Sequence, residues 1–391
     1  MVKKVAIIIE RADTSLGGAE RSMFEVADAL SALGLDVDLL AAKGATGHRN
    51  IRALCQNIPG KRVTLAAFSH VLQRHLTKAN YDIVHSVLPL DFADLYQPRG
   101  GTYAESMLRN VASYANPVVR LYKRMTARAN RRRMEFLRAE RRLCQGSKGP
   151  MIAALSQYVI DQLRRHYGTD PQRVVLTLNG VATDKGVDAD EVRELRTRIA
   201  GMMGSDPVLF LFVAHNFRLK GLDRLIRALR MAMETPMERP ACLAVVGAGR
   251  TDSHRRLARR LGVEDSIVFL GPLKQVRSAI SAADVGILPT FYDPSSRFIL
   301  EALAAGKPVI TTRFNGAADH FADGRHGVVV DSPDNIAALA KAIRHFAVTA
   351  HIRQASQAIL DDKLIEKISV RRVANELLGV YERIQERKKH L

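Results

Sequence analysis

Cysteine is scarce in this chain of 391 residues, and its three copies form no pattern. Cys55, Cys144 and Cys242 are far apart, odd in number, and lack the short spacing of cysteine metal ligands. We therefore expect no disulfide framework and no cysteine-held metal, as in a cytoplasmic protein.

Long hydrophobic runs are also absent. No stretch approaches the ~18–20 apolar residues that a membrane-spanning helix needs. The apolar run Val5–Ile9 is shorter than the ~7–15 residues of a signal-peptide core, so we interpret it as a buried strand. The sequence also lacks repeats of ~20–50 residues, which excludes solenoids and propellers.

Acidic residues are too few to balance the basic ones. Forty Asp and Glu face 59 Lys and Arg, so the formal net charge is +19 and polyanions are attracted at long range. Residues 104–150 alone carry twelve Lys and Arg against three Glu. The charge alone does not choose among nucleic acid, anionic lipid and phosphorylated glycan as the partner. Nucleic-acid segments interleave basic with aromatic residues, but here only Tyr114, Tyr122 and Phe136 occur, so we expect no nucleic-acid partner.

In this chain, continuous apolar runs alternate with helical patterns. Such runs are typical of strands that are buried on both faces of a parallel sheet. The expected strands are Val5–Ile9, Val37–Ala41, Ile83–His85, Met151–Leu155, Val208–Ala214, Cys242–Val246, Ile267–Leu270, Val285–Leu288 and Val309–Thr311. The expected helices between them include Ser22–Leu33, Leu222–Met233 and Arg255–Leu261. The length is about twice the ~100–200 residues of one domain, so the pattern predicts two doubly wound α/β domains.

A change to turn chemistry marks the domain boundary. Asn179-Gly180 favours a positive φ and interrupts the alternation. We therefore expect a Rossmann-like domain over 1–178 with a basic helical insert over 104–150, a second such domain over 179–368, and an amphipathic helix over 369–391.

Two cofactor signatures are missing. The turn Gly17-Gly18 follows the first strand and precedes a helix, so its backbone can approach an anion, but it matches neither the dinucleotide-binding nor the P-loop pattern. The Asp-x-Asp sequences at 36–38 and 188–190 alternate within a strand and open a helix, respectively, so we interpret both as structural. We expect no metal site and no bound cofactor.

The sharpest motif spans residues 291–310 and reads as loop, helix, turn and strand. Free backbone N–H groups at the helix start would form a pocket for a diphosphate. The residues of that pocket are Ser295, Ser296, Arg297 and Phe298. Asp293 and Glu301 flank it as acceptors for hydroxyl groups. The alternative is a buried helix packed on a sheet, with Asp293 as a turn residue.

This motif resembles the signature of the retaining GT-B glycosyltransferases of family 4, or group 1, in which two acids with seven residues between them precede a Gly-Pro-containing turn. The resemblance implies that Asp293, where the family has Glu, contacts the donor sugar and that Glu301 holds the ribose of the nucleotide. Lys220, before Gly221, matches the family's cation for the pyrophosphate, and Arg218 is its expected partner. The alternative is that both cations are solvated loop residues.

Further positions match the family more loosely. The resemblance places Gly17 and Gly18 near the donor phosphates, and Gly247 and Leu270 in loops that line the nucleotide base. It places His85, at the end of an expected strand, near the transferred sugar. A structural, hydrogen-bonded histidine is the alternative for that position.

The resemblance implies a GT-B fold, with two Rossmann-like domains facing across a cleft. It also implies a retaining, metal-independent hexosyltransferase with a nucleotide sugar as co-substrate and no cofactor. Residues from Glu140 to Arg173 are most similar to bacterial lipopolysaccharide-core glucosyltransferases. That implies transfer of glucose from a UDP-sugar to a cell-envelope glycan or lipid-linked acceptor. The alternative function is that of a sugar epimerase or a phosphorylase with the GT-B fold.

The basic segment predicts a membrane contact. Asn116-Pro117 is typical of a helix start, and apolar residues then recur near helical spacing over 118–143 with arginines around them. We expect this helix to bind the anionic inner face of the cytoplasmic membrane, which would make the protein cytoplasmic and peripheral. The alternative is a helix packed on its own domain, with a solvated basic face.

Overall fold

The computed structural model describes residues 2–13, 18–44, 50–60, 62–183, 186–204 and 206–389. The chain forms two compact units. Unit 1 comprises Met1–Val111, Asn116–Ala182 and Ser369–Leu391, and unit 2 comprises Ala112–Ala115 and Thr183–Ile368. The chain therefore passes from unit 1 to unit 2 near residue 182 and returns to unit 1 for its last helix.

Unit 1 contains a seven-stranded parallel sheet in the order β3-β2-β1-β4-β5-β6-β7. The strands are β1 (Lys4–Ala12), β2 (Asp36–Gly44), β3 (Ile51–Ala53), β4 (Ile83–Ser86), β5 (Leu95–Tyr96), β6 (Met151–Ala154) and β7 (Val174–Leu176). The helices are α1 (Gly18–Ala32), α2 (Leu65–Leu76), α3 (Tyr103–Ala112), α4 (Pro117–Thr126), η1 (Ala127–Ala129), α5 (Arg131–Cys144), α6 (Gln157–Tyr167), η2 (Pro171–Arg173) and α15 (Val370–Lys389).

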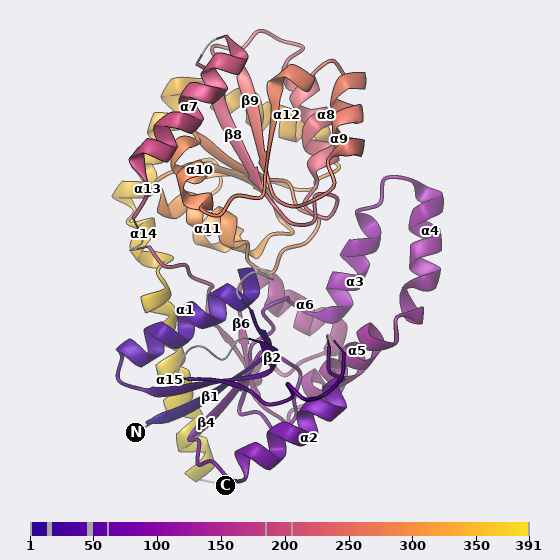
Figure 1. Ribbon diagram of the computed structural model, residues 1–391, viewed down its shortest axis with the longest axis vertical. Coiled ribbons are helices and arrows are strands. Elements are labelled where there is room, and N and C mark those ends of the chain that lie inside the picture. The colour runs from indigo at the N-terminus through magenta and orange to yellow at the C-terminus, as the bar shows by residue number, and fades with distance from the viewer. Residues whose placement is uncertain are drawn as a thin grey trace. The chain divides into compact units, whose positions relative to one another are not determined.

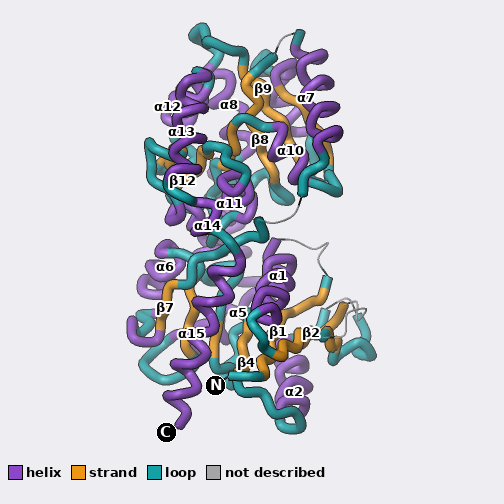
Figure 2. The backbone as a smooth tube through the Cα atoms, turned by 90° about the vertical axis from the view of Figure 1, so that its left-hand side faces the viewer, coloured by secondary structure: helices purple, strands orange, loops and turns teal. Residues whose placement is uncertain are grey.

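The central strand β1 is apolar on both faces because helices cover both. Val5, Ile7 and Ile9 pack with α1 and α15, whereas Ala6 and Ile8 pack with α2. Successive side chains of a strand point to opposite faces, so the continuous run fills two cores at once. Figures 1 and 2 show α1 and α15 side by side on one face of this sheet.

Unit 2 contains a six-stranded parallel sheet in the order β10-β9-β8-β11-β12-β13. The strands are β8 (Val208–Val213), β9 (Ala241–Val246), β10 (Ile267–Gly271), β11 (Val285–Leu288), β12 (Val309–Thr312) and β13 (Gly327–Val330). The helices are α7 (Ala189–Met203), α8 (Leu222–Ala232), α9 (Asp252–Arg260), η3 (Glu264–Ser266), α10 (Val276–Ala282), α11 (Arg297–Ala304), η4 (Gly316–His320), α12 (Ile336–Phe346), α13 (Thr349–Asp361) and α14 (Leu364–Lys367).

Each sheet reverses its direction of growth once, between β1 and β4 in unit 1 and between β8 and β11 in unit 2. Such a topological switch point leaves a crevice at the carboxyl ends of the strands, where open α/β sheets bind ligands. The prediction of two doubly wound α/β domains is thus confirmed, and all nine predicted strands are present. Strands β3, β5, β7 and β13, each of two to four residues, were not predicted.

The prediction for the basic segment is wrong in one respect: two helices replace one. Asn116 caps α4 and Pro117 takes its first position, as expected. The helix then ends, and the Asn130 side chain accepts a hydrogen bond from the N–H of Arg133 at 3.0 Å, which starts α5. No helix among residues 2–13, 18–44, 50–60, 62–183, 186–204 and 206–389 is long and apolar enough to cross a membrane.

Candidate functional site

The loop between β11 and α11 lies at the switch point of unit 2 and is held by hydrogen bonds to residues 314–316 and within the loop. Asp293 donates its backbone N–H to the carbonyl of Phe314 at 2.9 Å, and its carbonyl accepts from Gly316 at 2.9 Å. The Asn315 side chain accepts from the N–H of Ser296 at 3.1 Å. Ser296 caps α11, accepting from the N–H of Ile299. The predicted sugar-binding acid therefore stands on a rigid support.

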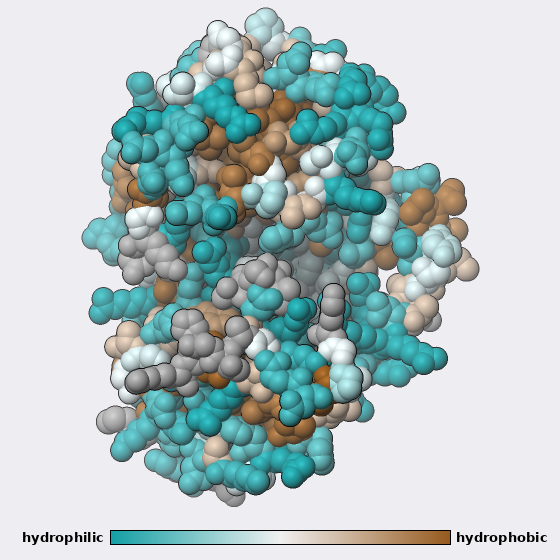
Figure 3. Space-filling model, viewed as in Figure 1, coloured by the Kyte–Doolittle hydropathy of each residue, from teal (hydrophilic) through white to brown (hydrophobic). Residues whose placement is uncertain are grey.

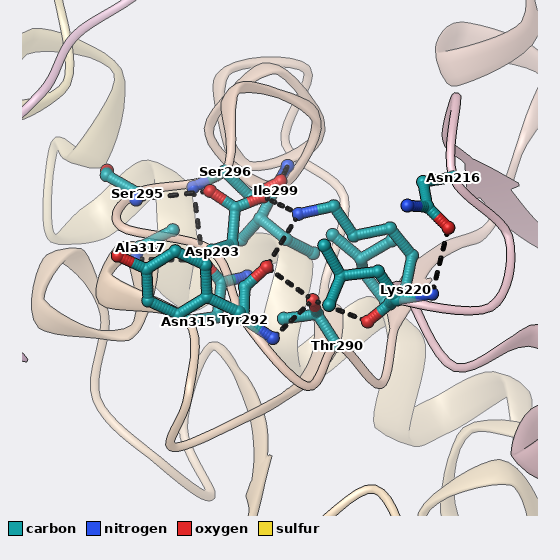
Figure 4. A network of polar contacts seen from close by, with 12 residues as sticks. Asn216, Lys220, Thr290, Tyr292, Asp293, Ser295, Ser296, Ile299, Asn315 and Ala317 are labelled. Carbon is teal, nitrogen blue, oxygen red and sulfur yellow. Dashed lines mark hydrogen bonds and ion pairs between the residues drawn. The ribbon is translucent and has the colours of Figure 1, made fainter. Parts of the chain in front are cut away.

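Asp293 is paired with Lys220, which the sequence predicted for the same site. The Lys220 Nζ lies 2.6 Å from Asp293 Oδ2 and donates to the carbonyl of Tyr292 at 2.8 Å (Figure 4). The other carboxylate oxygen accepts from the N–H of Ser295 at 3.2 Å. Both charged side chains are about four-fifths buried, so the pair is more strongly coupled than an exposed one.

Lys220 reaches this position through a tight turn after β8. Its N–H donates to the carbonyl of Asn216 at 3.0 Å, and the next residue, Gly221, has a φ of +81°. A Cβ at Gly221 would lie 2.1 Å from the carbonyl oxygen of Pro289, in the loop after β11. Only glycine fits there, and its absence of a side chain lets the two loops of the switch point touch.

Glu301 also has a basic partner. It lies one turn into α11 and pairs with Arg297 at 3.0 Å, both side chains being largely buried. Two acid–base pairs, Lys220–Asp293 and Arg297–Glu301, therefore flank the start of α11. This arrangement offers cations for a diphosphate and carboxylates for hydroxyl groups.

The expectation of free N–H groups at the start of α11 is wrong for two of the four residues. The N–H groups of Ser295 and Ser296 donate to Asp293 and Asn315, because the loop satisfies its own backbone. The Phe298 side chain is buried and would meet a Cβ added at Gly286 on β11 at 3.5 Å. The helix thus packs closely on the sheet, as the alternative interpretation required.

Gly247 and Leu270 lie at the carboxyl ends of two neighbouring strands, β9 and β10. Gly247 follows β9, has a φ of +143° and donates its N–H to the carbonyl of Gly271 at 2.9 Å. A Cβ on Gly247 would lie 1.8 Å from the carbonyl oxygen of Ala214. Leu270 lies near the end of β10 and is half-buried. The loops predicted to line the base are therefore adjacent to the loop that carries Lys220.

Arg218 takes other contacts in this structure. Its guanidinium donates to the hydroxyl of Ser113 and lies 3.8 Å from the ring centroid of Tyr114, both in the segment that belongs to unit 2. Burial lowers the pKa of this guanidinium. Lys220 thus forms a direct ion pair with Asp293, whereas Arg218 contacts Ser113 and Tyr114.

His85 is fully buried in unit 1, beside the switch point of that sheet. Its Nδ1 lies 2.7 Å from the hydroxyl of Tyr381 on α15. Burial, followed by the charge of Arg99, lowers the pKa of His85 to about 3, so the ring is neutral at neutral pH. This is the geometry of the structural histidine that the sequence left as the alternative. Direct contact with a substrate would require a ring nitrogen to become exposed.

The predicted glycine turn of unit 1 is described only in part. Gly18 is the first residue of α1, and Gly17 lies outside the described residues. Ser22, one turn further along α1, is buried and accepts a hydrogen bond from Arg99, which also donates to the distant, buried Asn179. Sequence reasoning missed Arg99, because nothing around it distinguishes a buried arginine from a solvated one.

The interpretation of the two Asp-x-Asp sequences as structural is confirmed. Asp188 caps α7, accepting from the N–H groups of Asp190 and Glu191 at 2.9 and 3.2 Å. Asp38, in β2, accepts from the hydroxyl of Tyr81 at 2.7 Å.

Comparison with known proteins identifies the chain's relatives. Residues 207–347 match the family of "Glycosyl transferases group 1", and residues 16–185 match "Glycosyltransferase Family 4". Lipopolysaccharide glucosyltransferase WaaG of Escherichia coli (strain K12) is 26% identical over 345 residues, 87% of this chain and 88% of that protein. The crystal structure of WaaG superposes with a TM-score of 0.74 at 23% identity, covering 96% of this chain and 99% of WaaG.

Two further matches are a curated glycosyltransferase and a solved structure. D-inositol 3-phosphate glycosyltransferase 2 of Catenulispora acidiphila is 36% identical over 184 residues, only 44% of this chain and 42% of that protein. The structure of Anabaena Alr3699/HepE in complex with UDP-glucose matches with a TM-score of 0.66 at 15% identity, covering 99% of this chain and 100% of that one. With both of its halves matched by family models and its fold shared with WaaG, the chain belongs to the group 1 and family 4 glycosyltransferases of GT-B fold.

Proposed function

We propose that this glycosyltransferase moves a hexose, with glucose as the first candidate, from a UDP-sugar to a cell-envelope glycan or lipid-linked acceptor with retention of anomeric configuration. The observation that carries the proposal is the Lys220–Asp293 pair at the switch point of unit 2. Ligands bind at such points in open α/β sheets. A cation and a carboxylate 2.6 Å apart suit the diphosphate and the sugar hydroxyls of one donor.

The proposed roles follow from the charges. Lys220 neutralises the diphosphate as the sugar–phosphate bond breaks, because charge develops there in the transition state. Arg218 is the second cation, once it leaves Ser113 and Tyr114. Asp293 accepts from the sugar and Glu301 from the ribose, while Gly247 and Leu270 border the base.

The proposed reaction needs neither a metal nor a cofactor, since Lys220 and Arg218 supply the positive charge. The acceptor attacks from the face that the diphosphate leaves, and a leaving phosphate oxygen takes its proton. Gly17 and Gly18 are proposed to lie near the donor phosphates, as the family resemblance implies. His85, buried against Tyr381, is better suited to support the sheet edge than to touch the sugar.

The experiment is a donor panel followed by product analysis. UDP-, GDP- and ADP-sugars are compared by thermal shift, since a ligand at 100 times its Kd adds roughly 2.7 kcal/mol of stability. The best donor is then incubated, with and without EDTA, with lipopolysaccharide core and with inositol phosphate, the two acceptor classes of the relatives' names. NMR of the product gives the anomer. Free epimerised sugar or a sugar phosphate would instead identify an epimerase or a phosphorylase.

We also propose that segment 118–143 places the protein on the anionic inner face of the cytoplasmic membrane. Helix α4 carries the stronger argument: Val118, Leu121, Tyr122 and Met125 are 60–72% exposed and recur at i, i+3, i+4 and i+7. Figure 3 shows the apolar side chains of this helix on the surface, at the right of the view. Arg120, Lys123 and Arg124 lie between them in sequence, a composition that suits an anionic bilayer surface.

In α5, by contrast, the apolar residues are covered. Phe136 and Leu143 are buried in unit 1, so this helix keeps the packing that the sequence analysis left as the alternative. The proposed contact with lipid is therefore assigned to α4.

A further inference from the structure

Phe217 lies in the loop after β8, immediately before the two cations of the proposed site, Arg218 and Lys220. Unlike Arg218 and Lys220, it is almost completely buried. Its ring meets Phe212 edge-on at 6.0 Å and His254 at 5.8 Å with an interplanar angle of 87°. Phe212 belongs to β8 and His254 to α9, so the ring joins the central strand to the helix that follows β9.

The loop after β9 is pressed against this ring. A Cβ added at Gly249 would lie 2.6 Å from Phe217 Cδ2, 2.7 Å from Cε2 and 2.8 Å from Cγ. A Cβ at Gly247 would lie 3.1 Å from Cε1 on another edge of the same ring. Contacts this short require the ring or the loop to move. The two glycines therefore let residues 247–249 rest directly on Phe217.

On its other side, Phe217 is tied to Lys220 by the backbone. The Phe217 carbonyl accepts from the N–H of Leu222 at 3.0 Å, and the Asn216 carbonyl accepts from the N–H of Lys220 at 3.0 Å. These bonds close the turn around Lys220. A shift of the Phe217 backbone would therefore be passed to this turn, which carries the ammonium group that lies 2.6 Å from Asp293.

We propose that Phe217 is a positioning residue that fixes the base-side loop 247–249 and Lys220 relative to each other. The two ends of the donor, base and diphosphate, are then held by one packed unit. This inference rests on the proposed function and adds a residue without polar atoms to the donor site. Its effect reaches the reaction only through Lys220 and the glycine loop, where small misplacements are costly.

The test uses the full chain with Gly249→Ala, Phe217→Ala and the double variant. Binding of UDP is measured by calorimetry, and kcat and KM with UDP-glucose as donor. We expect each single variant to raise the Kd for UDP and to lower kcat, by about tenfold or more. In the double variant the new methyl group occupies space that the ring leaves, so its loss is expected to be at least about fivefold smaller than the product of the single losses.

Phe210→Ala is the matched control, because Phe210 is an equally buried phenylalanine of β8. It is expected to lower the melting temperature as Phe217→Ala does while leaving kcat and the Kd for UDP within about twofold. The inference is overturned if Gly249→Ala has the Kd for UDP and the kcat of wild type. It is also overturned if Phe217→Ala, like Phe210→Ala, lowers the melting temperature but leaves kcat and the Kd for UDP unchanged. Failure of wild type to bind UDP or transfer sugar would instead remove the proposed function, and the inference with it.

Discussion

Lys220 and Asp293 are 73 residues apart in sequence and 2.6 Å apart in space. In the absence of a donor, the charges of Lys220 and Asp293 neutralise each other at a site where both side chains are largely buried. In the proposed reaction the diphosphate binds beside Lys220, whose ammonium group is already held by Asp293, so little reorganisation would be needed when charge develops in the transition state.

At this scale we expect Lys220→Ala to lower kcat by about 10²–10³-fold and to change donor affinity much less, because the charge it meets grows as the bond breaks. Initial-rate kinetics over a range of UDP-glucose concentrations separates the two effects. Arg227→Ala, an exposed change on α8, is the control and should behave as wild type. An unchanged kcat in Lys220→Ala would remove this lysine from the mechanism.

Glu301→Gln should weaken donor binding and preserve the fold. A charge-assisted hydrogen bond to ribose, worth about 1.5–3 kcal/mol, becomes a neutral one worth about 0.5–1.5 kcal/mol, so the Kd for UDP should rise roughly 5- to 10-fold. Calorimetric titration measures the Kd, and circular dichroism checks the fold. Glu264→Gln, an exposed partner of Arg259, serves as control. Equal UDP affinity in variant and wild type would show that the ribose lies elsewhere.

At the scale of elements, Glu140 joins four of them. It lies on α5 and accepts from the hydroxyl of Tyr96 on β5 and from the N–H of Tyr103 on α3, each at 2.7 Å, and from the hydroxyl of Tyr167 on α6. Burial raises the pKa of Glu140 to about 7, although these hydrogen bonds act in the opposite direction.

The folded state therefore keeps a proton that the unfolded chain loses near pH 4.5. Between that pH and about 7, this group makes the folded protein less stable as the pH rises, by at most about 1.4 kcal/mol per pH unit. Glu140→Gln removes this titration. We expect the variant to gain stability relative to wild type between pH 5 and pH 8 in urea unfolding, whereas Glu135→Gln on the same helix should not. A constant difference would mean that Glu140 titrates normally.

Helix α4 gives the second prediction at this scale. Reversing Arg132 is a poor test of membrane binding, because Arg132 pairs with Glu10 at 2.6 Å and donates to the carbonyl of Val63. Lys123→Glu with Arg124→Glu changes only exposed positions of α4. At about 1 kcal/mol per basic residue near the surface, we expect at least about 30-fold weaker co-sedimentation with phosphatidylglycerol vesicles.

Arg256→Glu with Arg260→Glu on α9 changes the net charge equally on exposed positions and should leave vesicle binding almost unchanged. Leu121→Ser with Met125→Ser should weaken the binding that remains at high salt, because the apolar stripe is not screened. Equal loss in the α4 and α9 charge variants would mean that total charge, and not α4, attracts the protein to lipid.

At the scale of the whole molecule, the chain's last helix completes its first sheet. Val373, Leu377 and Tyr381 of α15 share the core with Val5, Ile7 and Ile9 of β1. Unit 1 therefore depends on residues that lie more than 360 positions from β1 in the sequence.

We expect Tyr381→Ala to destabilise unit 1 by about 3–5 kcal/mol, since it leaves a cavity and removes the hydrogen-bond partner of His85. Hydrogen exchange followed by mass spectrometry should show faster exchange in β1 and β4, more than 290 residues away. Glu382→Ala, the exposed neighbouring position, is the control. Protection that is lost only within α15 would contradict this dependence.

The sequence by itself predicted the elements whose signal is local. A strand buried on both faces must be apolar throughout, so runs such as Val5–Ile9 and Val208–Val213 are visible without tertiary information. Caps are local too: Asn116-Pro117 and Asp188 mark helix starts because a nearby side chain satisfies free N–H groups. The family motif likewise pointed to Lys220, Asp293 and Glu301, although no periodicity shows that two of them form an ion pair.

Only the tertiary structure decided what depends on packing between distant segments. Whether an apolar stripe is buried depends on what lies opposite, so Phe136 and Met125 look alike in sequence although one is in the core and the other exposed. The partner of His85 comes from α15, almost 300 residues later. The N–H groups of Ser295 and Ser296 are taken by side chains of their own loop and of Asn315, and the need for glycine at 249 comes from the Phe217 ring. Each is a contact between surfaces that the chain brings together only by folding.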